Sequence, residues 1–262
     1  MIRNTVFIIA LTCSGLVQSA YGQANPEIKR CSDAIVNLVG DHLDISDFSY
    51  PKDGIYPSAE NGGVIIAGAC KVWPKDNSKT IAVFAYDAGV KYEKQLIVVL
   101  VDTIKGRIVA TYKGTIEEDA ALTVGENSFR IDTARYDLAP GIRAFGLDVT
   151  TSYSQGCGIG GSGPVRTLFI QDDKEIKPIL EDFYISSWKF IQEGQSRCTG
   201  VEADAPEESL YENVSYSLSV DTTSTNGYRD LLVTETISRD NGKKTGKPLR
   251  YKLHFDGEKY HK

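Results

Sequence analysis

The sequence predicts an all-β protein with one α-helix near its N-terminus. From residue 64 onward, short runs rich in Val, Ile, Thr, Tyr and Phe alternate with turn residues, a pattern typical of strands. Before residue 64, one segment has apolar residues at helical spacing. We therefore expect three parts: a signal peptide over residues 1–22, a helix and irregular loop over residues 23–63, and an all-β domain over residues 64–262.

The first residues have the organisation of a cleaved signal peptide. Arg3 supplies a positive charge, Thr5–Val17 is largely apolar, and Ala20-Tyr21-Gly22 is a small-residue cleavage site before Gln23. The apolar run is shorter than the ~20 residues that a membrane-spanning helix needs, and no later run reaches that length. We expect a mature chain without a membrane span, located in the Gram-negative periplasm or secreted.

The composition of the chain argues against some classes of binding partner. The 262-residue chain has a formal net charge of −6 and no basic tract, which argues against nucleic acid or an anionic membrane as partner. No motif for a nucleotide, a metal or a particular reaction is present, so we expect no cofactor and no metal. Another exported or envelope-resident protein is the expected partner.

The cysteines fit an oxidising compartment. Cys13 leaves with the signal peptide, and Cys31, Cys70, Cys157 and Cys198 remain. Four cysteines allow three connectivities. We favour Cys31 with Cys70 and Cys157 with Cys198, because each pair closes a local loop in its own half of the chain. A zinc site is not expected, since no C-x-x-C pair exists.

The predicted helix begins near Asn25, which can act as a cap, and Pro26, which suits the first turn. Six residues then recur at helical spacing: Ile28, Cys31, Ile35, Leu38, Val39 and His42. We expect the face that carries Cys31 to pack onto the body, and His42 to lie in the last turn, where a cation is favourable. Asp47–Gly63 has the composition of an irregular loop.

The segment Ile179–Gln192 is ambiguous, because Pro178 can open a helix whereas Tyr184, Ser186, Trp188 and Phe190 alternate as in a strand; we predict a strand there. All predicted strands are Val64–Trp73, Thr80–Tyr86, Gln95–Asp102, Arg107–Tyr112, Ser128–Ile131, Ile142–Thr151, Val165–Gln171, Tyr184–Ile191, Val214–Val220, Tyr228–Ile237 and Leu249–Phe255.

Two strand pairs form a weak internal repeat. Ile142–Val149 with Val165–Ile170, and Tyr228–Glu235 with Leu249–His254, each place an arginine second in both strands. The unit Tyr228–Tyr260 resembles the outer hairpins of bacterial propeller-type repeat proteins. This resemblance implies that the chain is similar to uncharacterised exported bacterial all-β proteins with propeller-like hairpin repeats. Either a β-sandwich or a small propeller-like architecture fits this pattern.

The most unusual local feature is a glycine-rich segment, Gly156–Pro164, which contains Cys157. A tethered flexible connection explains it, and so does a recognition loop with an apolar tip at Ile159. Tyr50 and Tyr56 belong to a second candidate surface, because tyrosine is favoured at interfaces. The candidate binding residues are Gly158, Ile159, Gly160, Gly161, Ser162, Tyr50 and Tyr56.

No histidine stands in a catalytic or metal pattern, and we expect His254 to be a solvent-facing strand residue. We therefore predict a non-catalytic protein-binding protein, such as an inhibitor or immunity protein. A carbohydrate-active or other hydrolytic enzyme with paired carboxylates is the alternative; a structural envelope-assembly factor is another. The acidic candidates for such an enzyme are Glu117, Glu118, Asp119, Asp172, Asp173, Glu207 and Glu208.

Overall fold

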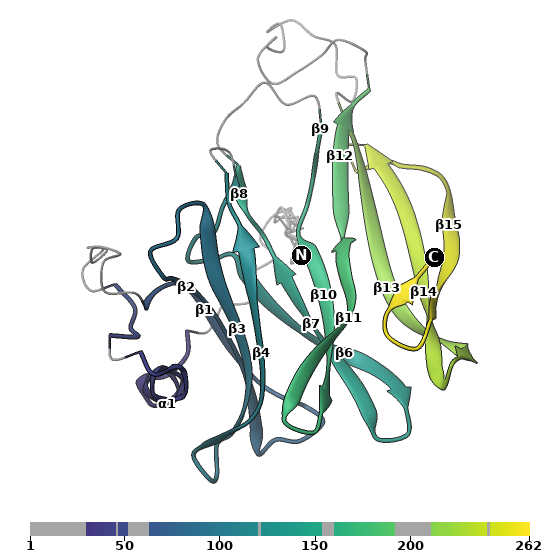
Figure 1. The fold of residues 1–262 in the computed structure, drawn as a ribbon. Helices are drawn as coiled ribbons and strands as arrows, with labels where there is room; N and C mark the ends of the chain where they lie inside the picture. Colours follow the sequence, from purple (N-terminus) through teal and green to yellow (C-terminus); the bar gives the residue numbers. More distant parts are fainter. Residues whose placement is uncertain are drawn as a thin grey trace, which may run out of the picture.

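The computed structural model describes residues 30–45, 47–51, 63–119, 122–153, 160–191, 211–239 and 242–262. Within these ranges the chain is mostly β with one helix, as the sequence predicts (Figure 1). The elements are α1 (Asp33–Leu43), β1 (Val64–Val72), β2 (Lys79–Asp87), β3 (Glu93–Asp102), β4 (Arg107–Glu117), β5 (Leu122–Thr123), β6 (Phe129–Ala139), β7 (Ile142–Val149), β8 (Ser152–Tyr153), β9 (Gly160–Ser162), β10 (Val165–Asp172), β11 (Glu175–Tyr184), β12 (Ser186–Phe190), β13 (Tyr211–Thr225), β14 (Tyr228–Arg239), β15 (Lys244–Phe255) and β16 (Tyr260–His261).

The first sheet has eight strands in the order β1-β2-β3-β4-β11-β10-β7-β6. It consists of two antiparallel groups of four, which are joined by one parallel pair, Glu175 with Thr111. The sheet curls until its end strands approach each other, and the Lys71 Nζ on β1 donates to the Ile131 carbonyl on β6 at 3.0 Å. The inside of this curl is filled by apolar side chains, including Trp73, Phe129, Phe145, Phe169 and Val98.

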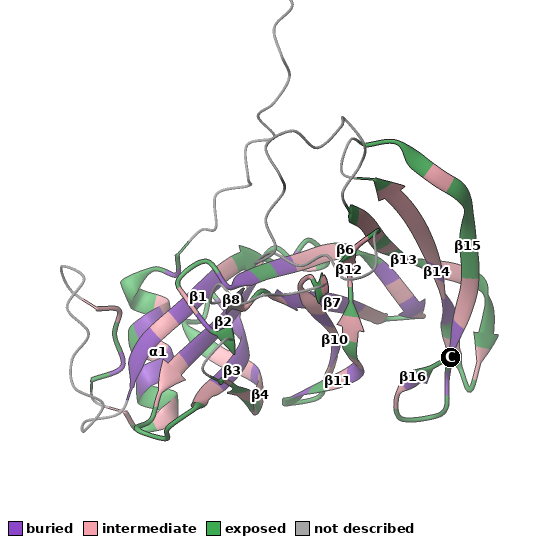
Figure 2. Cartoon of the chain, turned by 90° about the horizontal axis from the view of Figure 1, so that it is seen from above, coloured by how far each residue is buried: buried purple, intermediate pink, exposed green. Residues whose placement is uncertain are grey.

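The outer face of β1, β2 and β3 is covered by α1 (Figure 2). Because side chains alternate along a strand, Ile81 and Val83 point into the curl while Ala82 and Phe84 pack beneath the helix. Val36 and Val39 are the buried apolar residues of α1. These strands are therefore buried on both faces, which explains their nearly continuous apolar sequence.

A second sheet has six strands in the order β16-β15-β14-β13-β12-β9. Leu231 and Val233 on β14 pack with Leu168 and Ile179 of the first sheet, so this sheet covers the outer face of β6, β7, β10 and β11. The molecule has three layers: helix, curled sheet and second sheet (Figures 1 and 2). Face-to-face packing favours the sandwich interpretation over the propeller interpretation.

One long hairpin belongs to both sheets. β10 pairs with β11 in the first sheet, and β9 pairs with β12 in the second. The chain passes between the sheets at Gly163–Pro164 on one arm and at Ile185 on the other, where Ile185 donates to the Pro164 carbonyl at 3.0 Å. The ambiguous segment around Pro178 is therefore strand, as predicted, but it is two strands that change sheet at Ile185.

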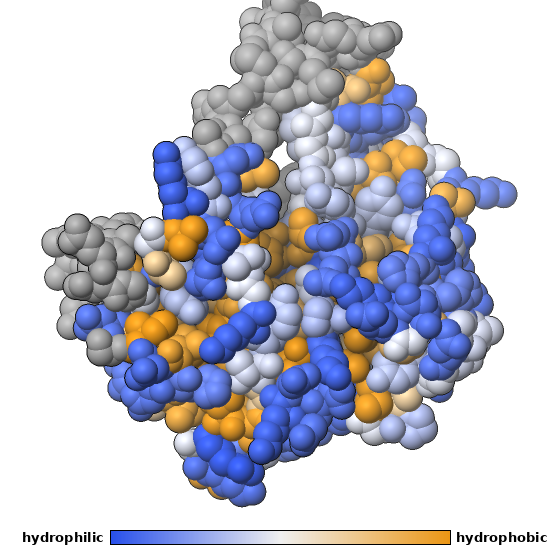
Figure 3. All heavy atoms as spheres, in the orientation of Figure 1, coloured by the Kyte–Doolittle hydropathy of each residue, from blue (hydrophilic) through white to orange (hydrophobic). Residues whose placement is uncertain are grey.

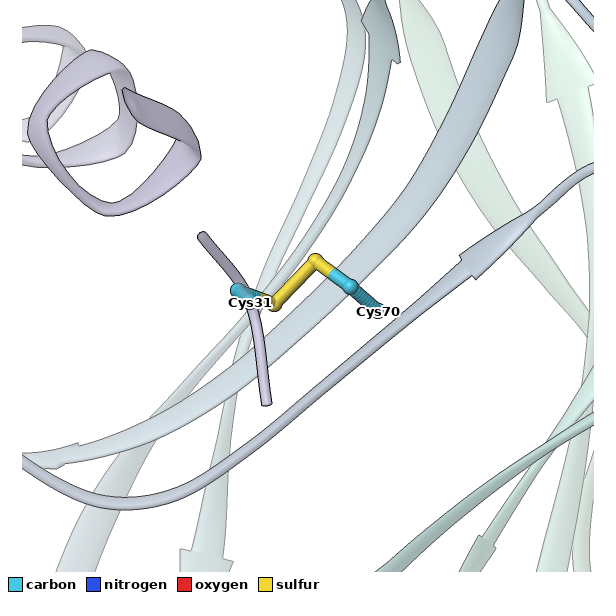
Figure 4. The surroundings of a disulfide bond; sticks show 2 residues. All are labelled: Cys31 and Cys70. Carbon is cyan, nitrogen blue, oxygen red and sulfur yellow. A yellow bond between two sulfur atoms is a disulfide. The ribbon is translucent and has the colours of Figure 1, made fainter. Parts of the chain in front are cut away.

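The Cys31–Cys70 disulfide is present, with its Cα atoms 5.0 Å apart (Figure 4). The expectation that Cys31 lies on the helix is wrong, because residues 30–32 are not helical and Ser32, in an extended conformation, precedes the first helical residue. The disulfide instead ties the chain just before α1 to β1. Cys157 and Cys198 lie outside the described residues.

The repeated strand pairs are antiparallel neighbours, β7 with β10 and β14 with β15. They belong to different sheets, and their arginines differ in environment: Arg166 is buried, whereas Arg229 and Arg250 are exposed. The described part of the chain has no radial arrangement of such units. The repeat is therefore a similarity of hairpin sequence and not of position in the fold.

Candidate functional site

Part of the glycine-rich segment is a strand and not the loop that the sequence predicts. Gly160, Gly161 and Ser162 form β9, the edge strand of the second sheet, and are paired with Lys189, Trp188 and Ser187 of β12. Gly158 and Ile159 lie outside the described residues. The predicted recognition segment therefore contributes an open sheet edge.

The glycines of β9 are required by Trp188. A Cβ atom at Gly161 would lie 2.7 Å from the indole Nε1 of Trp188, and one at Gly160 would lie 2.8 Å from its carbonyl oxygen. Both distances are shorter than the contacts that real Cβ atoms show. The absence of a side chain at Gly161 therefore lets the Trp188 ring lie against the edge strand, and this packing gives a structural reason for the glycine.

Three aromatic rings gather beside β9, and we name Trp188, Phe190 and Tyr211 the aromatic corner. The ring centroids of Trp188 are 5.7 Å from Phe190 and 6.1 Å from Tyr211, in edge-to-face geometry. Phe190 and Tyr211 are directly opposed across β12 and β13. Alternation along β13 places Tyr211 on the same face as the exposed Ser215, opposite to the face that packs on the first sheet.

The aromatic corner is accessible at its outer side. Tyr211 is 37% exposed and the neighbouring Ile191 is 39% exposed. Figure 3 shows hydrophobic side chains at the end of β12, next to the polar surface of the sheet. Sequence alternation alone indicated Trp188 and Phe190 as strand residues, but their grouping with Tyr211, 21 residues further along than Phe190, depends on the pairing of β12 with β13.

The outer edge of β9 has no partner strand among the described residues. Gly163 N–H donates to the Ser186 carbonyl at 2.6 Å, so this residue faces β12. Backbone groups alternate in direction along an antiparallel strand, which turns the N–H and C=O of Ser162 away from β12.

Tyr50 is not brought to the aromatic corner. Its ring lies beside Phe84 beneath α1, with centroids 6.4 Å apart, and the Arg30 guanidinium lies 4.9 Å from the ring centroid. The Tyr50 hydroxyl is buried without a hydrogen-bond partner among the described residues, and burial raises the pKa of Tyr50. This residue contributes to packing; Tyr56 lies outside the described residues.

Two of the carboxylates considered for hydrolysis, Glu118 and Asp172, pair with lysines. Glu118 accepts from the Val124 N–H at 2.7 Å and pairs with Lys94 at 3.2 Å. Asp172 pairs with Lys177 at 2.5 Å, while Glu117, Asp119 and Asp173 are exposed. Glu207 and Glu208 lie outside the described residues. Of the described candidates, Asp173 lines one of the two pockets considered below, and none of the others lines either of them.

A groove of about 570 Å³ lies where the turns after β1, β3 and β10 meet the end of α1. Its acids stabilise turns: Asp76 accepts from the Ser78 hydroxyl at 2.6 Å, and Asp102 accepts from the Lys105 N–H at 3.0 Å. His42 lies in the last helical turn, as predicted, with Nε2 3.2 Å from the Thr111 hydroxyl. The groove is polar but has no pair of free acids.

His254 is a solvent-facing strand residue, as predicted, with a side chain that is 53% exposed, but its ring also contacts a buried carboxylate. Its Nδ1 lies 3.1 Å from Asp230 Oδ1 and 3.2 Å from the Thr225 hydroxyl, and Asp230 is buried. Thr223 and Thr225 also donate to Asp230. No local sequence pattern indicates this group, because its members come from three strands. No cluster of metal-ligating side chains occurs among the described residues, and no described helix is long and apolar enough to cross a membrane.

Comparison of the chain with known protein families, with curated proteins and with solved structures found no match.

Proposed function

We propose that this chain is an exported, non-catalytic protein-binding protein, periplasmic or secreted, and that its contact surface is the aromatic corner together with the free edge of β9. An inhibitor or immunity protein is the kind of binding protein that we propose, and an envelope-assembly factor is the alternative. The observation that carries the proposal is the grouping of three aromatic rings at an open sheet edge, on the face that does not pack on the first sheet.

The residue types support a protein partner. Tryptophan and tyrosine are enriched among residues that dominate binding energy, because they bury much area with few rotatable bonds. An extended partner segment can add to an open sheet edge, where backbone hydrogen bonds give affinity and side-chain contacts give specificity. At β9 the Ser162 N–H and C=O supply the backbone groups, and the aromatic corner supplies the side-chain contacts.

Export is supported by the N-terminal sequence and by the Cys31–Cys70 disulfide. Disulfides persist in oxidising compartments and are rare in the cytosol. Fractionation of cells that express the full chain tests this part of the proposal: the processed protein is expected in the periplasm or medium, starting near Gln23, and an unprocessed cytosolic protein would overturn it.

The binding surface is tested with the mature chain as bait on envelope extract, followed by identification of the captured protein and titration of the purified pair. Ser162→Pro removes the outward N–H without removing a hydrogen bond to β12, and is expected to weaken binding about tenfold, the effect of ~1.4 kcal/mol. Ser162→Ala keeps the N–H and is the matched control, with affinity close to wild type.

Tyr211→Ala tests the side-chain contacts. It is expected to weaken binding of the same partner by ~2 kcal/mol, in the range of interface anchor residues. Tyr184→Ala is its control, since Tyr184 is 48% exposed on β11, outside the aromatic corner. Wild-type affinity in both Ser162→Pro and Tyr211→Ala would place the contact surface elsewhere on the molecule.

A further inference from the structure

A second pocket lies at the turn between β6 and β7, away from β9. It has a volume of about 450 Å³. Its apolar wall is the turn itself, Ala139–Ile142, and its charged wall comes from four side chains of separate strands and turns. The charged residues are Lys75 after β1, Asp137 on β6, Arg143 on β7 and Arg229 on β14.

Arg143 is a largely buried cation with incomplete compensation. Its side chain is 12% exposed, and Nη2 donates to the Thr133 carbonyl at 3.0 Å. Its Nε is buried and has no hydrogen-bond partner among the described residues. The nearest carboxylate oxygen, on Asp137, is 3.9 Å from Nε, and Asp137 is itself 48% exposed. A buried charge of this kind is costly unless an anion and hydrogen bonds satisfy it.

The other two cations add to this excess of positive charge. The Lys75 ammonium donates to the Gly141 carbonyl and lies 5.4 Å from the centroid of the Trp73 ring, but it has no ion pair among the described residues. Arg229 is exposed and likewise has no ion pair there. The pocket therefore has three cations and one carboxylate, although the whole chain has a net charge of −6. A local excess of positive charge of this kind favours the binding of an anion.

We propose that this pocket binds a phosphate group, either as inorganic phosphate or as a phosphate monoester. The excess of two positive charges matches a dianion. Guanidinium groups present planar pairs of N–H donors that fit phosphate oxygens, and Arg143 and Arg229 bring two such groups to the pocket. Pro140 and Ile142 provide an apolar wall against which the organic part of a monoester packs. This site is separate from the aromatic corner and does not depend on the proposed function.

Isothermal titration of the mature protein with inorganic phosphate, and separately with glycerol phosphate as a simple monoester, tests the proposal. Saturable binding with a Kd of ~1 mM or below is expected for at least one probe. Tighter binding of glycerol phosphate would identify a monoester as the natural form, and equal or tighter binding of inorganic phosphate would identify the free ion. Absence of saturation by both probes up to ~10 mM would overturn the proposal.

Arg229→Gln is the decisive variant, because Arg229 is exposed and its loss leaves the fold intact. This variant should weaken phosphate binding about tenfold, because it removes a hydrogen bond between charged groups. Arg250→Gln makes the same change in charge at an exposed position of β15 outside the pocket, and should bind as wild type. Equal affinities for the two variants would show that binding reflects overall charge and would refute the site.

Arg143→Gln tests the buried donor. It is expected to weaken binding at least as much as Arg229→Gln. Since Arg143 also donates to the Thr133 carbonyl, the folding of this variant is checked by circular dichroism, and Lys75→Gln serves as a second variant at an exposed residue. Phosphate should raise the thermal midpoint of wild type and Arg250→Gln more than that of Arg229→Gln at the same phosphate concentration, because a ligand stabilises the state that binds it in proportion to its affinity.

Discussion

Asp148 on β7 lies at the centre of a buried ion network. It is 1% exposed and is held by two arginines, Arg166 with Nε 2.6 Å from Oδ1 and Arg130 with Nη2 2.6 Å from Oδ2. Arg166 also pairs with Asp132 at 2.9 Å. Gly146 makes this possible, because a Cβ atom there would lie 3.2 Å from the Asp132 Cβ and 3.5 Å from the Arg166 Nε.

Asp148→Asn should destabilise the protein by about 3–5 kcal/mol, since it leaves the buried Arg166 guanidinium without its main counter-ion. Urea unfolding at neutral pH measures the change. Arg135→Gln is the control, because Arg135 is 83% exposed and its pair with Asp137 is 3.6 Å long; it should shift stability by less than about 0.5 kcal/mol. A loss below about 1 kcal/mol for Asp148→Asn would show that the network is not a stabilising element.

The environment of Asp230 predicts that the stability of the folded protein depends on pH. Burial raises its pKa, but the hydrogen bonds from Thr223, Thr225 and His254 outweigh burial and hold the pKa below its usual value. A carboxyl with a lowered folded-state pKa adds stability above its unfolded pKa of about 4, and this contribution is lost as pH falls through the folded pKa. Asp230→Asn should therefore cost about 1–3 kcal/mol at pH 7 and less at pH 3, below the unfolded-state pKa.

Urea unfolding of wild type and Asp230→Asn at both pH values measures this difference. Asp173→Asn is the comparison, since Asp173 is an exposed residue of the turn between β10 and β11, outside the second sheet. Equal destabilisation by Asp230→Asn at neutral and acid pH would mean that the ionised carboxylate is not what the three donors stabilise.

At the scale of elements, α1 is held by one apolar face and by the disulfide that precedes it. The helix contributes Val36 and Val39 to the cluster over β1–β3, and the Cys31–Cys70 bridge closes a loop with a sequence separation of 39. In the chain-entropy model such a loop stabilises the folded state by about 4 kcal/mol. The Cys31→Ser/Cys70→Ser variant should lose a large part of this amount in denaturant unfolding.

The same variant separates two roles of the bridge. If the disulfide mainly anchors α1, hydrogen exchange should speed up in Asp33–Leu43 while the amides of β2 and β3 remain protected. Uniform loss of protection across the first sheet would show that α1 is needed for the whole fold. An unchanged denaturation midpoint would contradict a stabilising role for this bridge.

The elements themselves were largely predictable, because their signals are local. Every predicted strand overlaps a strand of the structure, and the sequence alternation near Trp188 correctly favoured strand over helix. The helix was expected to begin too early, since spacing alone does not show where Ser32 ends the extended segment. Short strands such as β9 and β16 were missed, because two or three residues carry no periodicity.

At the scale of the whole molecule, the hairpin that spans both sheets predicts that they unfold together. β10 and β11 are central strands of the first sheet, β9 and β12 continue them into the second, and the two sheets share one apolar cluster. Neither sheet can therefore lose its packing without exposing apolar surface on the other. A single cooperative transition is expected.

The two tryptophans report on the two sheets separately. Trp73 lies inside the curl of the first sheet, and Trp188 lies at the edge of the second. In Trp188→Phe the fluorescence follows Trp73 alone, and in Trp73→Phe it follows Trp188 alone. Each trace should coincide with the circular dichroism transition of the same variant. An earlier transition for Trp188 would show that the second sheet melts as a separate unit.

The sequence by itself determined the β class, the presence of one helix before the first strand and the strand segments, and it favoured the Cys31–Cys70 pair among three connectivities, because each depends on composition or on spacing along the chain. The tertiary structure decided the strand order, the passage of one hairpin between two sheets, the aromatic corner, and the meeting of Lys75, Arg143 and Arg229 in one pocket. These features join residues that are distant in sequence. Their positions follow from which apolar faces bury each other, and no local pattern records that choice.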